Sequence, residues 1–271
     1  MQRSSGKRAA TSNTRVAVSY IGPIPRLPSP YIASIDANPA RLSPVLASLF
    51  PPGAIAAELR EPGDPSLLLP AEAQYLGKAV RKRVQEFSAG RLCARALLAQ
   101  FGILDFAIEV GEARQPVWPE SLVGSITHTA GFCAAVVAEK SRFAAIGMDC
   151  EVAGSVKPEL WPSICTPEEI IWLNSLPETS RVDAATLIFS AKEAFYKCQY
   201  PLTGERLTFH DARVDAPDWG AAGGTYTILP TRRIALADTA ALPLRGRYLF
   251  HQQFVTAGLS WPQPRSRAVI F

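Results

Sequence analysis

The feature that most constrains this chain is an apolar run that ends in two acidic side chains, Ile146-Gly147-Met148-Asp149-Cys150-Glu151. Residues 143–146 are also apolar, which predicts a strand buried on both faces. Side chains alternate along a strand, so Asp149 and Glu151 should share one face while Cys150 points to the other. Carboxylates at the rim of a buried strand can bind a cation. Two solvated acids at an ordinary strand end would give the same short pattern, so other motifs must decide.

The length of 271 residues allows one large or two smaller domains with a sizeable core. The formal net charge of +4 is too mild to indicate nucleic acid, but it suits an acidic partner or a phosphate-rich ligand. No segment is apolar enough to span a membrane, and the N-terminus lacks the apolar core of a secretory signal. Residues 1–15 are basic, serine-rich and free of acids, which predicts a disordered tail, with an organellar address as the alternative. The cysteines are scattered without a C-x-x-C pair, which indicates reduced thiols in a cytoplasmic protein: Cys93, Cys133, Cys150, Cys165 and Cys198.

A helical pattern runs from about residue 71 to residue 101, with Pro70 at its start and Gly102 as its stop. Arg83, Phe87 and Arg91 fall on one face of this predicted helix. The two arginines lie two turns, or roughly 12 Å, apart along the axis. A solvated basic face would look the same, although the planar guanidinium fork suits phosphate well.

Three strand-like runs follow at 122–128, 132–138 and 143–149, joined by short connections. They should run up, down and up, so the first and third runs point the same way. That arrangement brings His128 and Asp149 to one edge of the sheet. A histidine at a strand end is either a structural hydrogen-bonding group or a functional one, and both interpretations stay open here.

The second part of the chain predicts a loop at 152–162, a helix that begins at Thr166-Pro167, and a second helix over 181–200. Pro201 and Gly204 should end this second helix. Residues 207–271 alternate short apolar runs with turns and predict the strands of a second sheet. The helix over 181–200 should pack Leu187, Ala191 and Ala194 inward and present a separate stripe of Phe189, Glu193, Tyr196 and Lys197.

Several stretches in this order resemble a 4'-phosphopantetheinyl transferase of the surfactin-type class, and within it the enterobactin-synthase group. The resemblance covers roughly residues 67–257. Its central motifs are Gly124-Ser125-Ile126-Thr127-His128-Thr129, Ile146-Gly147-Met148-Asp149-Cys150-Glu151 and Phe189-Ser190-Ala191-Lys192-Glu193-Ala194-Phe195-Tyr196-Lys197. Further matches are Arg83-Val84-Gln85-Glu86-Phe87-Ser88-Ala89-Gly90-Arg91, Arg114-Gln115-Pro116-Val117-Trp118-Pro119, Gly246-Arg247-Tyr248 and Val255-Thr256-Ala257.

The resemblance implies transfer of the phosphopantetheine arm of coenzyme A to a serine of an apo acyl or peptidyl carrier protein, with release of adenosine 3',5'-bisphosphate. It implies an α+β, sandwich-like fold of two similar halves related by a pseudo-twofold axis, here 16–142 and 143–271, with coenzyme A between them. Magnesium is the expected metal, with manganese as an alternative. We expect a cytoplasmic monomer with neither nucleic-acid nor membrane partners. Fatty acid, polyketide, siderophore and other peptide carriers all remain open as substrates.

The resemblance also implies the residue roles. Asp149, Glu151 and Glu193 would hold the metal, Glu193 would act as general base, and Lys197 would stabilise or protonate the leaving phosphate. Catalytic His128 would contact the pyrophosphate or 3'-phosphate, with Thr127 beside it in the coenzyme A site. Arg83, Arg91 and Arg114 would bind the 3'-phosphate and adenine side. Acidic carrier helices suggest a basic docking surface at Lys78, Arg81 and Lys82.

Two other functions compete with transfer. A non-catalytic module that binds coenzyme A or a carrier domain would need no complete site, whereas this chain carries all three candidate metal ligands. A magnesium-dependent nuclease would place its second acid and lysine two residues apart on one strand. Here Glu193 and Lys197 are four residues apart in a helical pattern, and the net charge is low for tight binding to a phosphate backbone.

Overall fold

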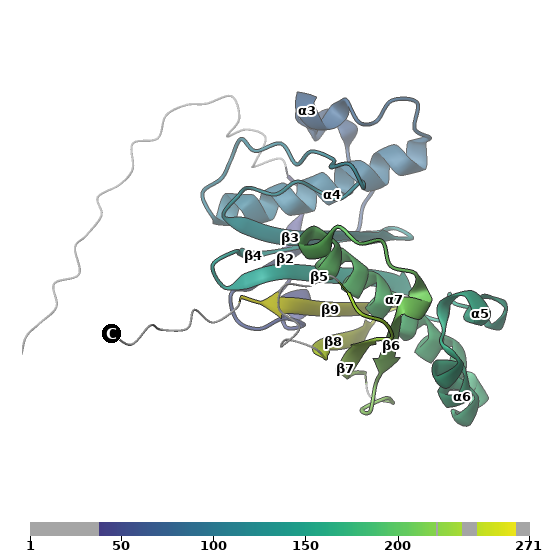
Figure 1. Cartoon of the computed structure of the whole chain (residues 1–271). Helices are drawn as coiled ribbons and strands as arrows, with labels where there is room; N and C mark the ends of the chain where they lie inside the picture. Colours follow the sequence, from purple (N-terminus) through teal and green to yellow (C-terminus); the bar gives the residue numbers. More distant parts are fainter. Residues whose placement is uncertain (1–37, 221, 235–242, 264–271) are drawn as a thin grey trace, which may run out of the picture.

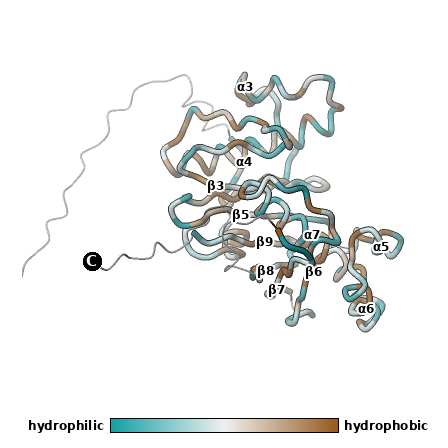
Figure 2. The backbone as a smooth tube through the Cα atoms, in the orientation of Figure 1, coloured by the Kyte–Doolittle hydropathy of each residue, from teal (hydrophilic) through white to brown (hydrophobic). Residues whose placement is uncertain are grey.

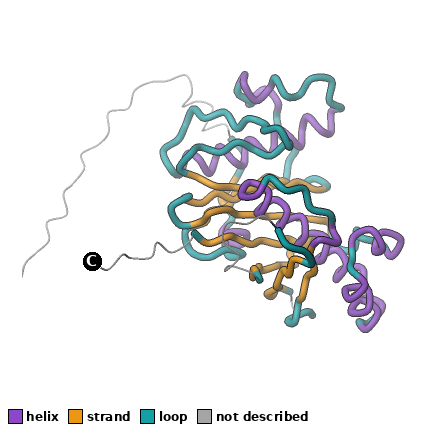
Figure 3. Tube along the Cα trace, viewed as in Figure 1, coloured by secondary structure: helices purple, strands orange, loops and turns teal. Residues whose placement is uncertain are grey.

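The computed structural model describes residues 38–220, 222–234 and 243–263 (Figure 1). The predicted tail at 1–15 lies outside these ranges. The fold is α+β, with two antiparallel sheets that each carry a long helix (Figure 3). The first sheet has the strand order β1-β2-β4-β3: Arg41–Leu42, Ala54–Leu59, Phe132–Glu139 and Leu122–Thr129. The second has the order β5-β9-β8-β7-β6: Phe143–Val152, Phe254–Pro262, Leu244–His251, Gly223–Pro230 and Ala212–Asp215.

The long helix of the first part, α4 (Arg81–Gln100), packs on the sheet face of β2 and β4. The prediction of one helix from residue 71 was wrong at its start. Pro70 begins a separate short helix, α3 (Pro70–Ala73), and Gly77 then has a φ of +48°, a left-handed conformation that interrupts a helix. The predicted stop at Gly102 is confirmed, because α4 ends at Gln100, Phe101 is its C-cap, and Gly102 follows with a φ of +73°.

The three predicted strands exist as β3, β4 and β5, but they do not form one sheet. β4 pairs with β3 on one side and with β2 on the other, so β5 pairs instead with β9 and begins the second sheet. The expected edge shared by His128 and Asp149 is therefore a seam between the edge strands of two sheets. Hydrogen bonds from β5 to side chains of β3 show that these two strands lie side by side across this seam.

Side-chain hydroxyls hold the seam together in place of a backbone ladder. Ser125 Oγ accepts a hydrogen bond from Met148 N at 3.1 Å, and Thr127 Oγ1 accepts one from Cys150 N at 3.0 Å. The paired positions advance in the same direction on both strands, so β3 and β5 run parallel, as the up-down-up prediction requires. The division predicted at residues 142 and 143 falls in the turn before β5, but the two-half organisation stays a prediction.

The second part contains a 26-residue helix, α7 (Glu178–Thr203), which is longer than predicted at both ends. Pro201 lies inside its final turn, and the helix ends at Gly204, whose φ is +66°. Thr166 caps α6 (Pro167–Ser175) in a capping box with Glu169, which confirms the predicted helix start. The predicted loop at 152–162 was only partly right, because it contains short helical turns. The short elements are α2 (Pro44–Ala47), η1 (Pro65–Leu67), η2 (Pro158–Leu160), α5 (Trp161–Ile164) and η3 (Phe209–Asp211).

Three apolar clusters fill the interior, and the sheet strands carry much of the hydrophobic sequence (Figure 2). One lies between α4 and the first sheet, one between α7 and the second sheet, and one under α2 between the sheets. Leu187, Ala191 and Ala194 are fully buried on the inner face of α7, as predicted. The helix approaches β5 so closely that a Cβ on Gly147 would lie 1.9 Å from the carbonyl oxygen of Ala194. This contact fixes α7 beside β5, so Lys197 of the helix reaches Asp149 near the end of the strand.

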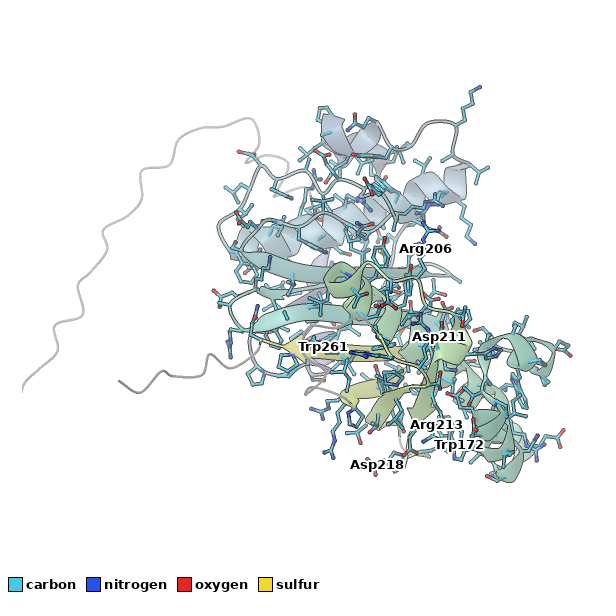
Figure 4. All side chains as sticks on the ribbon, viewed as in Figure 1. Trp172, Arg206, Asp211, Arg213, Asp218 and Trp261 are labelled. Carbon is cyan, nitrogen blue, oxygen red and sulfur yellow. The ribbon has the colours of Figure 1, made fainter. Side chains whose placement is uncertain are left out.

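The far end of the second part is a smaller aromatic and polar surface. Figure 4 labels Trp172 on α6, Arg213 on β6 and Asp218 in the following turn at this end of the molecule. Trp172 meets Trp219 edge to face at 5.9 Å between ring centroids. Among the described residues, no helix is both long and apolar enough to cross a membrane.

Candidate active site

The candidate site lies where β3, β5 and α7 meet. Asp149 is 3% exposed, and its Oδ1 accepts hydrogen bonds from Lys197 Nζ at 2.6 Å and from Thr127 Oγ1 at 3.2 Å. Ser190 Oγ on α7 donates to the backbone carbonyl of Asp149 at 3.0 Å. All three elements therefore converge on one carboxylate.

The other oxygen of Asp149, Oδ2, is buried and has no hydrogen-bond partner within the described residues. Leaving a carboxylate oxygen unsatisfied is costly, and such groups often mark functional sites. Glu151 follows two positions on, and its side chain accepts from Thr129 Oγ1 at 3.4 Å. Both acids point to the same face of β5, as the strand alternation predicts.

The acids repel one another. Burial raises the pKa of Glu151 to about 7, and the neighbouring Asp149 and Glu193 add to the shift. Burial also raises the pKa of Glu193, with a further contribution from Asp149. Burial alone would lower the pKa of Lys197, but the three carboxylates Asp149, Glu193 and Glu151 reverse this effect and raise it. Glu151, Glu193 and Asp149 thus lie in one electrostatic neighbourhood with a single lysine.

These residues suit a cation, although they are not arranged around one here. Within ranges 38–220, 222–234 and 243–263, no three His, Cys, Asp or Glu side chains are close enough to hold a metal ion. Lys197 instead supplies the positive charge next to Asp149. The unpartnered Oδ2 of Asp149 and the mutual repulsion of the acids are what a hard divalent cation relieves, because it prefers oxygen ligands.

His128 lies near the end of β3, on the side of the site that faces α4. Its Nε2 lies 2.9 Å from Arg83 Nη1, and its Nδ1 lies 3.8 Å from Glu86 Oε2. Burial lowers the pKa of His128, Glu86 opposes this shift, and Arg83 and Lys197 reinforce it. Because arginine only donates, the neutral ring accepts at Nε2 and directs its Nδ1–H toward Glu86. Sequence reasoning missed Glu86, although its i,i+3 spacing from Arg83 is a signal for proximity.

The three arginines predicted to bind the 3'-phosphate and adenine side line one cleft, with a volume of about 320 Å³. Arg91 is 7% exposed, stacks over Phe87 at 3.8 Å from the ring centroid, and donates to the carbonyl of Ile108 at 3.2 Å. Burial lowers the pKa of Arg91 to about 10, and the nearby positive charge of Arg83 contributes to the shift. The remaining walls of this arginine cleft are Tyr75, Leu76, Ala79, Val110 and Arg114.

Two further cavities adjoin Glu193 and Tyr196. One of about 410 Å³ extends toward Leu207 and Phe209 after the end of α7. The other, of about 560 Å³, extends along the seam past Lys197 toward Trp118 and also touches Arg114. Glu193 therefore stands between two hollows, within reach of ligands from either side.

A buried ion pair next to Glu193 was not anticipated from the sequence. Lys192 donates to Glu169 Oε2 at 2.7 Å and to the carbonyls of Ile164 and Phe209 at 2.8 and 2.9 Å. It therefore ties α7 to α5, α6 and η3. The only sequence signal was its position beside Glu193 in the α7 motif.

The remaining predicted residues are also located. Lys78, Arg81 and Lys82 are exposed around the N-terminus of α4, beside Arg83 and His128. All five cysteines are free and buried, and Cys150 points into the core, away from the carboxylates.

Comparison with known proteins gives consistent results. The 4'-phosphopantetheinyl transferase N-terminal domain matches residues 71–138, and the 4'-phosphopantetheinyl transferase superfamily matches residues 145–240. The 4'-phosphopantetheinyl transferase Npt of Nocardia iowensis is 34% identical over 223 residues, covering 80% of this chain and 100% of the relative. Svp of Streptomyces mobaraensis, also named a 4'-phosphopantetheinyl transferase, is 38% identical over 68% of this chain and 75% of its own length. Enterobactin synthase component D of Escherichia coli strain K12 is 41% identical over 48% of this chain and 61% of its own length. The chain therefore belongs to the 4'-phosphopantetheinyl transferase superfamily.

Proposed function

We propose that this enzyme performs its transfer with a divalent metal ion, Mg²⁺ or alternatively Mn²⁺, at the end of the seam between β3 and β5. The reaction moves the 4'-phosphopantetheine arm of coenzyme A to a serine of an apo carrier protein and releases adenosine 3',5'-bisphosphate. The observation that carries the metal proposal is the buried, unpartnered Oδ2 of Asp149 beside two carboxyl groups whose pKa values are raised.

Asp149, Glu151 and Glu193 would hold the ion. When bound, it would neutralise the negative charge of the pyrophosphate. Asp149 is the most rigid of the three, because Thr127 and Lys197 fix its Oδ1. Glu151 and Glu193 are half-buried and less constrained, so they can adjust to a ligand.

Glu193 suits the role of general base for the carrier serine. Its raised pKa makes the carboxylate a better proton acceptor, and it lines both neighbouring cavities. Lys197 remains charged, because its pKa is raised by the surrounding carboxylates. It would stabilise the negative charge that develops on the leaving phosphate.

The arginine cleft suits the nucleotide end of coenzyme A. Arg83, Arg91 and Arg114 line one cavity, and two of these guanidinium groups are close enough to influence each other's charge. A 3'-phosphate would relieve that repulsion through charge-assisted hydrogen bonds. His128 lies between the arginine cleft and the acids, so with Thr127 it would contact the phosphates in between.

The proposed carrier surface is the exposed basic group Lys78, Arg81 and Lys82 around the start of α4. Positive charge there complements the acidic helices expected of carrier proteins.

The proposal also includes a monomeric enzyme that works in the cytoplasm. The five free, buried thiols are compatible with a reducing compartment.

The test is a transfer assay with coenzyme A, magnesium and a panel of apo carriers from fatty acid, polyketide and peptide assembly lines. We expect mass spectrometry to show the phosphopantetheine addition on at least one carrier, and EDTA to stop the reaction until Mg²⁺ is added back. Glu193→Gln should lower the rate by at least about a thousandfold, because the amide neither accepts the serine proton nor carries a ligand charge.

Glu178→Gln is the matched control, since this exposed glutamate lies on the same helix far from the seam. It should transfer at the wild-type rate. Coenzyme A binding without modification of any carrier would instead support a non-catalytic module. An active Glu193→Gln enzyme would contradict the assigned base.

A further inference from the structure

A fully buried carboxylate, Glu72, lies behind the arginine cleft and joins three separate segments. Its Oε2 accepts the backbone N–H of Leu69 at 3.0 Å and faces Arg95 Nη1 of α4 at 3.4 Å. Its Oε1 accepts the backbone N–H of Ile108 at 3.1 Å. The side chain of Glu72 is 0% exposed, so these contacts are protected from water.

The three segments that Glu72 joins are the three walls of the cleft. The segment after Leu69 supplies Tyr75, and the segment after Ile108 supplies Val110 and Arg114. Helix α4 supplies Arg83, Phe87 and Arg91. None of these walls pairs with another as a strand or helix, so side chains must set their spacing.

Two more contacts act at the same junction. The carbonyl of Ile108 accepts from Arg91 Nε at 3.2 Å, while its N–H donates to Glu72, so one peptide segment links the two side chains. Nearer the surface, Tyr75 Oη donates to Glu109 Oε2 at 3.0 Å and joins two walls directly. Tyr75 is 40% exposed, so its hydroxyl can be removed without opening the core.

Charge supports the same arrangement. Arg91 is buried, and burial disfavours its charged form, but the negative charge of Glu72 opposes that effect. Glu72 also faces Arg95, so a single carboxylate offsets two nearby guanidinium charges. A buried acid that serves two arginines while binding two backbone amides cannot be replaced by a neutral side chain at no cost.

We propose that Glu72 and Tyr75 are positioning residues for the nucleotide end of coenzyme A. They hold the segments after Leu69 and Ile108 at the spacing that lets Arg91 and Arg114 converge on one phosphate. This inference rests on the proposed function of the arginine cleft as the 3'-phosphate site. If so, both residues determine the affinity for the 3'-phosphate, and neither affects the rate of the chemical step.

The test compares steady-state transfer by wild type, Glu72→Gln and Tyr75→Phe with two substrates, coenzyme A and 3'-dephospho-coenzyme A. For Glu72→Gln we expect the KM for coenzyme A to rise about tenfold. The NH2 group of glutamine donates only, so it must face another donor, either a backbone N–H or the guanidinium of Arg95. For Tyr75→Phe we expect a rise of about threefold. For both variants kcat should stay within about twofold, and the KM for 3'-dephospho-coenzyme A should hardly change.

Tyr248→Phe is the matched control, because it removes one tyrosine hydroxyl bond, to the carbonyl of Asp218 at 3.1 Å, in the other part of the molecule. It should leave both KM values unchanged. Thermal unfolding establishes whether Glu72→Gln is folded, and if it is not, Tyr75→Phe decides alone.

The outcomes separate the two proposals. A wild-type enzyme that fails to prefer coenzyme A over its 3'-dephospho form would contradict the arginine cleft as the 3'-phosphate site. A wild type that shows this preference, together with folded variants that keep it in full, would overturn the positioning role. A fall in kcat for both substrates would also overturn it, since that result indicates general damage to the enzyme.

Discussion

Asp149 combines two environments in one side chain. Its Oδ1 is fixed by Lys197 and Thr127, whereas its buried Oδ2 finds no partner among the described residues. An unsatisfied buried carboxylate oxygen costs about 1 to 3 kcal/mol or more. A fold selected only for stability would place an amide or hydroxyl donor opposite this Oδ2. The missing donor therefore indicates a ligand site.

The pH dependence of stability can be predicted for one residue outside the site, His251. Burial lowers its pKa below the ordinary value of about 6.5, Arg60 adds to the shift, and Glu58 opposes it. The unfolded chain therefore binds the proton more readily than the folded one. Stability from the neutral ring is present above about pH 6.5 and is lost as pH falls toward the lowered pKa.

His251→Gln should flatten this dependence below about pH 6.5, because glutamine does not titrate. The new amide can still reach Thr256 Oγ1, which lies 2.8 Å from His251 Nε2. Urea unfolding of both proteins at several pH values measures the difference. Equal slopes in wild type and variant would contradict the shifted pKa of His251.

At the level of elements, the contact between α7 and β5 determines where Glu193 and Lys197 lie. The helix rests directly on Gly147, and a Cβ there would meet Ala194 O at 1.9 Å and Cys198 N at 2.9 Å. These atoms belong to the helix backbone and cannot rotate away. A glycine at this position therefore lets β5, which carries Asp149 and Glu151, and α7 approach closely.

Gly147→Ala should destabilise the protein by about 3 kcal/mol, because overpacking forces α7 away from β5. Gly131→Ala is the comparison, since its Cβ would meet nothing within 4 Å and only the φ of +72° is unfavourable. It should cost about 1 kcal/mol. Denaturant unfolding gives both values, and an equal loss in the two variants would contradict the proposed close contact.

Across the whole molecule, the seam between β3 and β5 is both the junction of the two sheets and the floor of the site. Hydroxyl groups, rather than a backbone ladder, bridge it at Ser125 and Thr127. Thr127 performs two tasks, because the same Oγ1 accepts from Cys150 N and donates to Asp149 Oδ1. Stability of the junction and geometry of the carboxylate are therefore coupled.

Thr127→Val should cost about 2 kcal/mol of stability, since it leaves the buried Cys150 N–H without its partner while keeping the side-chain shape. It should also lower kcat for transfer by roughly tenfold, because Asp149 loses a donor. The control is Thr225→Val, which removes an exposed hydroxyl that bonds Asp218 at 2.7 Å. Unchanged unfolding and transfer in Thr127→Val would show that the seam does not depend on this hydroxyl.

Local order was predictable from local chemistry. The alternation at Asp149, Cys150 and Glu151, the cap at Thr166 and the inward face of α7 depend on neighbours within a few positions. The two-residue period of a strand, the period of a helix and the residue type at a helix cap can be read directly from such short stretches. The order of the motifs likewise indicated the family, because each motif is a short continuous stretch.

Tertiary structure alone decided everything that depends on which segments meet. It assigned β5 to a second sheet because β2 already occupies the free edge of β4, and it brought Arg114 to Arg83 and Arg91. It also enclosed Glu72 and Lys192 among backbone groups distant in sequence. The burial of a side chain and the identity of its partners depend on many long-range contacts, which no local pattern contains. The sequence by itself therefore determined which functional side chains are available, and the packing determined where they come together.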